Sequence, residues 1–400
     1  MVDSINQIGQ NTQLAALLSG LVAMLFAGLI SFTTTPLVRV LAYKIGAIDV
    51  PKDNRRMHKK PMPLIGGVAI FLGFTLSSML FAEFSPQLVA LWFGGLVIVI
   101  MGVLDDVFDL NPFVKLAVQF VAAFIAVSQG IVIEFITIFD QMIVFGKLAV
   151  PITVLWIVGL TNAINIIDGL DGLSCGVSAI CSLSLLVVTL MRGDPVSALL
   201  TAILAGSCLG FLPFNSNPAK IFMGDTGALF LGYTLAVISI NGLFKFHALL
   251  SFMIPICIFG LPIFDITFAF IRRIIHGKNP FKGDRGHLHH RLVDMGFNVK
   301  QAVHILYAIC GILGISAVMF TDDKPARATA VIVIGIIVLV LNHSILANPA
   351  TRKKAGIDLP PLPKPEEEET ANAEASQDET AQAAETVTEE NRPDTPQNGG

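Results

Sequence analysis

Residues 14–38 read LAALLSGLVAMLFAGLISFTTTPLV, an apolar stretch without a single charged side chain. About 20 predominantly apolar residues are enough for a helix to cross the hydrocarbon core of a bilayer. The stretch therefore predicts a transmembrane helix. It does not fit a cleavable signal peptide, because residues 1–13 carry no positive charge and the apolar run is too long.

Further apolar stretches of similar character follow along the chain, so the sequence predicts an all-α polytopic integral membrane protein with about eleven transmembrane helices. A count of ten is the alternative, because several stretches are marginal in length. The predicted spans are 14–38, 64–82, 88–104, 115–133, 149–167, 172–191, 197–214, 226–243, 248–271, 302–320 and 328–346.

The composition agrees with this fold class. Hydrophobic residues make up 54% of the chain and charged residues 14%, whereas a soluble domain carries about 25% charged residues. Mean hydropathy is +0.72, which excludes an ordinary soluble enzyme. The five cysteines lie in apolar stretches without metal-type or disulfide spacing, and we interpret them as small hydrophobic residues.

Charge divides the chain into two unlike parts. Residues 1–357 carry a net charge of +6, and residues 358–400 a net charge of −10. The acidic part begins DLPPLPKPEEEE and has no aromatic residue, so it cannot bury enough apolar surface to fold. We expect an extracytoplasmic segment 1–13, a transmembrane domain 14–346, and a cytoplasmic tail 347–400 that is disordered from about residue 358.

The orientation follows from the lysines and arginines, because basic loops stay in the cytoplasm. If loop 39–63 is cytoplasmic, alternation places 19 of the 24 basic residues of 1–357 on the same side. Loops 39–63 and 272–301 hold seven each. The N-terminus is then outside and the C-terminus is cytoplasmic.

Acidic residues also gather at the predicted cytoplasmic side, and acids near a membrane are costly enough to indicate function. In GVLDDVFDLNPFVK, Asp105 and Asp106 project about 100° apart on a helix, and Asp109 is expected on the same face. Three acids this close need a cation, which is how an Mg²⁺ site with oxygen ligands is built. A plain polar turn is the alternative.

Two further motifs continue this pattern. NAINIIDGLDGL places Asn162, Asn165, Asp168 and Asp171 at intervals of three residues, which favours ligand contact or, alternatively, hydrogen bonds between helices. NPAKIFMGDTG places Asp225 at the start of a helix, in a loop of small residues that suits phosphate binding. An ordinary N-cap is the alternative for Asp225.

The longest cytoplasmic loop contains DRGHLHHRL, with Asp284, Arg285, His287, His289, His290 and Arg291. Histidines and arginine together hold a diphosphate through charge-assisted hydrogen bonds. Zinc is less fitting, because neither cysteine nor an HExxH motif accompanies the histidines. A merely basic loop is the alternative. Acids, basic groups and a small-residue loop on one membrane face together indicate phosphoryl transfer, which depends on positioning and charge neutralisation.

LDDVFD, NAINIIDGLDGL, NPAKIFMGDTG and DRGHLHHRL, in this order, resemble the polyprenyl-phosphate N-acetylhexosamine-1-phosphate transferase superfamily. KDNRRMHKKPMPLIGG resembles its first cytoplasmic loop, and the match covers roughly residues 39–300. The run His-Leu-His-His-Arg resembles the bacterial branch that uses UDP-N-acetylglucosamine. The muramoyl-pentapeptide branch has an unbroken triple histidine.

The resemblance implies transfer of N-acetylglucosamine-1-phosphate from UDP-N-acetylglucosamine to undecaprenyl phosphate, with release of UMP. It places a Mg²⁺-dependent, multi-pass enzyme in the bacterial inner membrane, with its active site at the cytoplasmic face. Mn²⁺ is expected to substitute for Mg²⁺. The product would begin O-antigen, enterobacterial common antigen or teichoic acid synthesis. The resemblance also suggests a homodimer; no nucleic-acid partner is expected.

Residue roles follow from the same resemblance. Asp225 and Asp168 are expected to ligate the metal, with Asp105, Asp106, Asp168 and His290 forming the catalytic set. Asp105 is predicted to deprotonate the lipid phosphate, and Asp106 to support the site. Substrate contacts are expected from Lys115, Asn165, Asp171, Asn215, Phe222, His287, His289 and Arg291, with Asn215 and Phe222 at the uracil.

Four alternatives stay open. Another UDP-sugar, such as UDP-N-acetylgalactosamine, a diacetylated aminosugar or the muramoyl-pentapeptide nucleotide, would undergo the same chemistry. A covalent two-step mechanism through an aspartate would give the same products. A non-catalytic membrane scaffold would keep the fold without needing the acids, and a secondary transporter would place its charges deeper in the spans.

Overall fold

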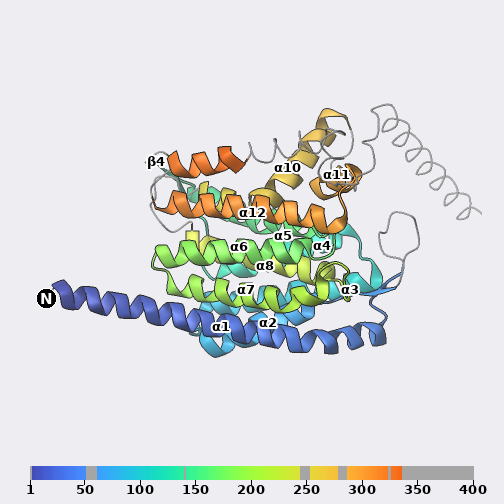
Figure 1. Ribbon diagram of the computed structural model, residues 1–400, viewed down its shortest axis with the longest axis horizontal. Helices are drawn as coiled ribbons and strands as arrows, with labels where there is room; N and C mark the ends of the chain where they lie inside the picture. The colour runs from blue at the N-terminus through green and yellow to red at the C-terminus, as the bar shows by residue number, and fades with distance from the viewer. Residues whose placement is uncertain are drawn as a thin grey trace, which may run out of the picture. The chain divides into compact units, whose positions relative to one another are not determined.

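The computed structural model describes residues 2–50, 61–138, 141–243, 253–277, 286–322 and 326–335. Within these ranges the chain forms a bundle whose long helices lie roughly parallel to one another (Figure 1). Its first half contains α1 (Val2–Ile45), α2 (Gly67–Phe81), α3 (Pro86–Phe108), α4 (Pro112–Ser128) and α5 (Ala149–Ile166). The second half contains α6 (Leu173–Met191), α7 (Pro195–Asn215), α8 (Gly224–Leu243), α9 (Met253–Ile258), α10 (Gly260–Ile275), α11 (Leu288–Asp294) and α12 (Val299–Thr321), followed by a helix at Ala326–Gly335.

Every predicted span coincides at least in part with a helix. Seven of the described helices are long and apolar enough to cross a membrane. Shorter apolar helices at Gly67–Phe81, Pro112–Ser128 and Ala326–Gly335 overlap the predicted spans 64–82, 115–133 and 328–346. These helices support a multi-pass membrane protein, while the exact number of crossings and their orientation stay predictions.

Two spans differ most from the sequence prediction. α1 begins at Val2 and continues to Ile45 as one helix, so it includes residues that we expected before and after the span. The predicted span 248–271 is divided into α9 and α10 at Phe259, where the backbone leaves the helical conformation (φ −99°, ψ 18°). The acidic tail from residue 358, much of the basic loop 39–63, and Asp284 and Arg285 lie outside the described residues.

Two small antiparallel sheets accompany the helices. β1 (Ile48–Asp49) pairs with β2 (Met62–Pro63), and β3 (Phe135–Ile138) pairs with β4 (Gln141–Val144). A 3₁₀ turn, η1 (Gly146–Leu148), leads from β4 into α5. The segment after β2 also pairs with residues before α8, because Phe222 N–H donates to Pro63 O at 2.9 Å and Gly66 N–H to Phe222 O at 3.0 Å. The all-α prediction holds for the bundle but missed these strands.

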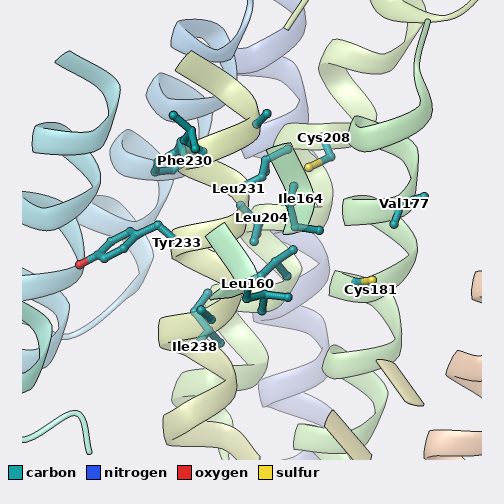
Figure 2. Packing of buried hydrophobic residues seen from close by; sticks show 14 of the residues in the cluster. Leu160, Ile164, Val177, Cys181, Leu204, Cys208, Phe230, Leu231, Tyr233 and Ile238 are labelled. Carbon is teal, nitrogen blue, oxygen red and sulfur yellow. The ribbon is translucent and has the colours of Figure 1, made fainter. Parts of the chain in front are cut away.

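α8 lies at the centre of the bundle and contacts α2, α3, α5, α6 and α7. Its sequence, GDTGALFLGYTLAVISINGL, is apolar on all sides, as expected for a helix surrounded by other helices. Figure 2 shows side chains from four helices packed together in this core. The labelled residues are Leu160 and Ile164 of α5, Val177 and Cys181 of α6, Leu204 and Cys208 of α7, and Phe230, Leu231, Tyr233 and Ile238 of α8.

α1 and α7 approach each other closely along small residues. A Cβ added at Gly206 would overlap the carbonyl oxygen of Met24, and one added at Gly210 would overlap that of Gly28. Ala23 and Ala27, which precede Met24 and Gly28 in α1, are fully buried. Small residues allow membrane helices to pack backbone against backbone in this way.

We expect Gly206→Ala to destabilise the protein by about 1–3 kcal/mol, the usual cost of overpacking. Gly159→Ala is the matched control, because Gly159 is also within a helix but has open space around its Cβ position; it should be neutral or slightly stabilising. Thermal labelling of the five buried cysteines with a thiol-reactive dye measures unfolding in detergent. Equal midpoints for the two variants would contradict the close approach of α1 and α7.

Candidate active site

Asp106, in the last turn of α3, caps the N-terminus of α8. Its Oδ1 accepts the N–H of Asp225 at 2.9 Å, and its Oδ2 accepts the N–H and hydroxyl of Thr226 at 3.2 and 2.6 Å. The first N–H groups of a helix have no partner within the helix and favour a negative charge nearby. Asp106 therefore fixes the position of Asp225.

Lys115, on α4, joins two carboxylates. Its Nζ lies 2.6 Å from Asp105 Oδ2 and 3.0 Å from Asp225 Oδ2. Asp105 is buried, and its Oδ1 accepts the N–H of Leu110 at 2.8 Å. Residues from α3, α4 and α8 thus meet at one end of the bundle, as the sequence predicted for the acids.

Asp109 does not share the helical face of Asp105 and Asp106. α3 ends at Phe108, and Asp109 is an exposed C-cap residue with φ +52°. The expectation of one continuous helical face was wrong, because the chain turns here to begin α4 at Pro112.

The end of α5 supplies two more residues. The side chain of Asn165 hydrogen-bonds to Asp225. Asp168 follows in the turn between α5 and α6, where removal from water and the nearby charges of Asp225, Asp106 and Asp171 raise its pKa well above the usual value. Four carboxylates therefore share this region with the Lys115 ammonium.

Asn162, one turn before Asn165, lies in a different environment. Its Nδ2 donates to Gln119 Oε1 at 2.5 Å, and Gln119 Nε2 donates back to Asn162 Oδ1 at 3.3 Å. This pair links α5 to α4. Both interpretations of the Asn and Asp stripe therefore apply to part of it. Asn162 makes a hydrogen bond between helices, and Asn165 lies in the candidate active site.

Asp171 holds the loop that precedes α8. Its Oδ2 accepts the Asn217 side-chain amide at 2.9 Å and the N–H of Ala219 at 3.0 Å. Asn215, at the end of α7, is buried and donates to Ile221 O at 3.2 Å, and Phe222 is half-buried. The predicted uracil residues thus lie at the end of α7 and in the loop that follows it, and Asp171 connects this loop to the turn carrying Asp168.

The histidine segment forms α11 and lies against this turn. His289 is buried with its Nε2 beside Gly169, so closely that a Cβ on Gly169 would overlap the ring. Burial and the neighbouring His290 lower the pKa of His289 to about 4, so its ring is neutral at neutral pH. His290 is half-buried, whereas Arg291 is exposed.

His287 is held by an acid from another helix. Its Nδ1 lies 3.0 Å from Oδ2 of Asp265, which is buried in α10. Asp265 lies within the predicted span 248–271, and the sequence alone did not indicate its partner. Tyr307 of α12 was missed as well; its hydroxyl donates to Gly172 O at 2.5 Å, behind the turn with Asp168 and Asp171.

The residues suit a magnesium ion by chemical type. Among the described residues, no three His, Cys, Asp or Glu side chains converge as a preformed metal cage. Mg²⁺ needs no such cage, because it usually takes one or two carboxylates and completes its shell with water and substrate phosphates. Asp225 and Asp168 interact electrostatically and each offers carboxylate oxygens, so the chemical type of the donors fits the ion.

Comparison with known proteins adds an independent result. Residues 88–243, which include most of these motifs, match the family described as Glycosyl transferase family 4. A Bacillus subtilis protein, "Probable undecaprenyl-phosphate N-acetylglucosaminyl 1-phosphate transferase", is 43% identical over 303 residues, covering 74% of this chain and 84% of that protein. A Mycobacterium tuberculosis "Decaprenyl-phosphate N-acetylglucosaminephosphotransferase" is 33% identical over 347 residues, covering 79% and 85%.

A third relative is the "Undecaprenyl-phosphate alpha-N-acetylglucosaminyl 1-phosphate transferase" of Thermotoga maritima. It is 35% identical over 267 residues, which cover 66% of this chain and 79% of that protein. The three relatives confirm the family resemblance that the motifs carry.

Gly224→Ala tests the contact between α3 and α8. Gly224 has φ +71°, and a Cβ there would overlap the Asp106 carboxylate, whereas Gly193 has φ +70° and open space. Both alanine variants carry left-handed strain of about 1–2 kcal/mol. We expect only Gly224→Ala to lose a further ~1–3 kcal/mol, measured by thermal unfolding. Similar losses in both variants would show that Asp106 does not hold α8.

Proposed function

Because this chain belongs to glycosyl transferase family 4, in the branch of polyprenyl-phosphate N-acetylglucosamine-1-phosphate transferases, we propose the following activity. The protein transfers N-acetylglucosamine-1-phosphate from UDP-N-acetylglucosamine to undecaprenyl phosphate and releases UMP. The observation that carries the proposal is the group of Asp105, Asp106, Asp168 and Asp225 around the Lys115 ammonium. This group lies at the N-terminus of α8, where backbone amides favour anions.

In this reaction an oxygen of the lipid phosphate attacks the phosphorus attached to the sugar. The bond from that phosphorus to the oxygen of UMP breaks, and UMP leaves. A phosphate monoester is largely a dianion at neutral pH, so it is already a competent nucleophile. The protein therefore contributes mainly positioning and charge compensation.

The residues divide this work among them. Lys115 lies beside Asp105 and provides a positive charge for a phosphate. We assign to Asp105 the removal of the remaining proton from the lipid phosphate. Asp106 keeps Asp225 in place rather than reacting. Asp225 and Asp168 would hold Mg²⁺, which neutralises diphosphate charge when bound. Asn215 and Phe222 are proposed for the uracil, and His290 and Arg291 for the diphosphate and sugar.

The proposed site faces the cytoplasm of a bacterial inner membrane. Basic residues near this end of the bundle support the assignment, since Lys44 lies in the last turn of α1 and Arg272 and Arg273 in the last turn of α10. Basic groups are retained on the cytoplasmic side, where nucleotide sugars are made. The product would begin a cell-envelope polysaccharide.

The test is UMP release by purified protein with Mg²⁺ and undecaprenyl phosphate. UDP-N-acetylglucosamine, UDP-N-acetylgalactosamine and the muramoyl-pentapeptide nucleotide are compared. We expect lipid-dependent UMP from UDP-N-acetylglucosamine alone. UMP from another sugar would keep the reaction and change the donor, and no UMP from folded protein would contradict the activity.

Asp225→Asn tests the metal assignment. We expect a loss of UMP release of about 100-fold or more, because a metal ion contributes several kcal/mol to transition-state stabilisation. Mg²⁺ should also cease to raise the thermal unfolding midpoint. Asp194→Asn is the control, since Asp194 caps α7 at the other end of that helix from Asn215. Near-normal turnover of Asp225→Asn at saturating substrate would refute the assignment.

A further inference from the structure

Asp265 is a buried acid of α10, and both of its side-chain oxygens contact the same other segment. Its exposed fraction is 3%. Oδ1 accepts the N–H of Leu288 at 2.8 Å, and Oδ2 lies 3.0 Å from His287 Nδ1. The carboxylate thus holds the first turn of α11 from the side of α10, across 22 residues of sequence.

The surroundings of Asp265 are apolar. A small cavity next to it is lined by Ile167, Leu173, Leu261, Leu288, His289 and Leu306. A carboxylate in such surroundings costs several kcal/mol to remove from water unless its hydrogen bonds are made. Leucines from α10 and α11 already line this cavity, so packing around it needs no charge. An acid in this place therefore indicates a requirement for its specific partner, His287.

The partner lies within reach of the candidate active site. The rings of His287 and His289 stack in parallel, with centroids 5.9 Å apart. His289 in turn lies against Gly169, next to Asp168. A change in the orientation of the His287 ring would therefore also shift His289, the residue of α11 that contacts the turn carrying Asp168.

We propose that Asp265 is a positioning residue that orients His287 toward the diphosphate of the donor nucleotide. The inference rests on the proposed function. The carboxylate of Asp265 accepts a hydrogen bond from the Nδ1–H of His287. The partner of one ring nitrogen sets the role of the other, so Nε2 is the ring atom that would contact the ligand. Asp265 itself touches no substrate, so it acts only through His287 and α11.

Two substitutions separate orientation of the ring from folding of the segment. In Asp265→Asn the amide oxygen can still accept the Leu288 N–H, but the amide nitrogen cannot accept from His287. We expect kcat for UMP release to fall about 10-fold, as for removal of partners that orient a site residue. Hydrogen exchange of residues 286–293 should stay close to wild type. Asp265→Ala removes both acceptors and should also increase this exchange.

A double-mutant cycle with His287→Ala provides the decisive comparison. If Asp265 acts through His287, Asp265→Asn should cost less than about 2-fold in the His287→Ala background, because the two changes are coupled. Asp194→Asn, a helix-capping aspartate at the start of α7, should not alter kcat in either background. The inference would be overturned if the losses of kcat in the two single variants multiplied in the double variant, or if Asp265→Asn had a normal kcat.

Failure of the proposed function has a different signature. A folded wild-type protein that releases no UMP from any nucleotide refutes the activity and with it the diphosphate as the ligand of His287. Hydrogen exchange still decides whether Asp265 holds α11, because that measurement needs no substrate. Unchanged exchange in Asp265→Ala would overturn the positioning role itself.

Discussion

The carboxylate of Asp106 at the N-terminus of α8 is the interaction on which the rest of the site depends. α8 is surrounded by other helices, and the amides of its first turn are partly buried. A buried N–H group without a partner costs about 1–3 kcal/mol. Asp106 satisfies two such groups and the Thr226 hydroxyl at once. It thereby sets where Asp225 lies relative to Lys115 and Asp105.

The remaining carboxylates give the site an excess of negative charge. Lys115 compensates part of it by bridging Asp105 and Asp225. The pKa of Asp168 is raised by its removal from water and, in addition, by repulsion from the charges of Asp225, Asp106 and Asp171. A divalent cation would remove this repulsion, and a phosphate could then approach Lys115 from the same side. Repulsion between the acids is therefore consistent with a site that is completed only when metal and substrate bind.

Much of the fold was predictable from local sequence, because a bilayer requires long apolar helices and such helices are visible in a window of 20 residues. The alternation of spans also predicted that Asp105, Asp168 and Asp225 meet at one end of the bundle. The break between α9 and α10 was not visible, since both halves are apolar. Contacts such as Asp265 with His287, or Pro63 with Phe222, join segments far apart in sequence and follow only from the packed helices.

Three of the aspartates share a function that their sequence motifs do not reveal. Asp106, Asp171 and Asp265 each accept a backbone N–H from a distant segment, namely α8, the loop before α8, and α11. Hydrogen bonds to a charged acceptor are short and strong, and low dielectric strengthens them further. A backbone donor is rigidly attached to its chain, so such a bond positions a whole segment rather than one side chain. The acids that build the site and the acids proposed for its chemistry are therefore partly different residues, although Asp106 and Asp171 occur in the same motifs as Asp105 and Asp168.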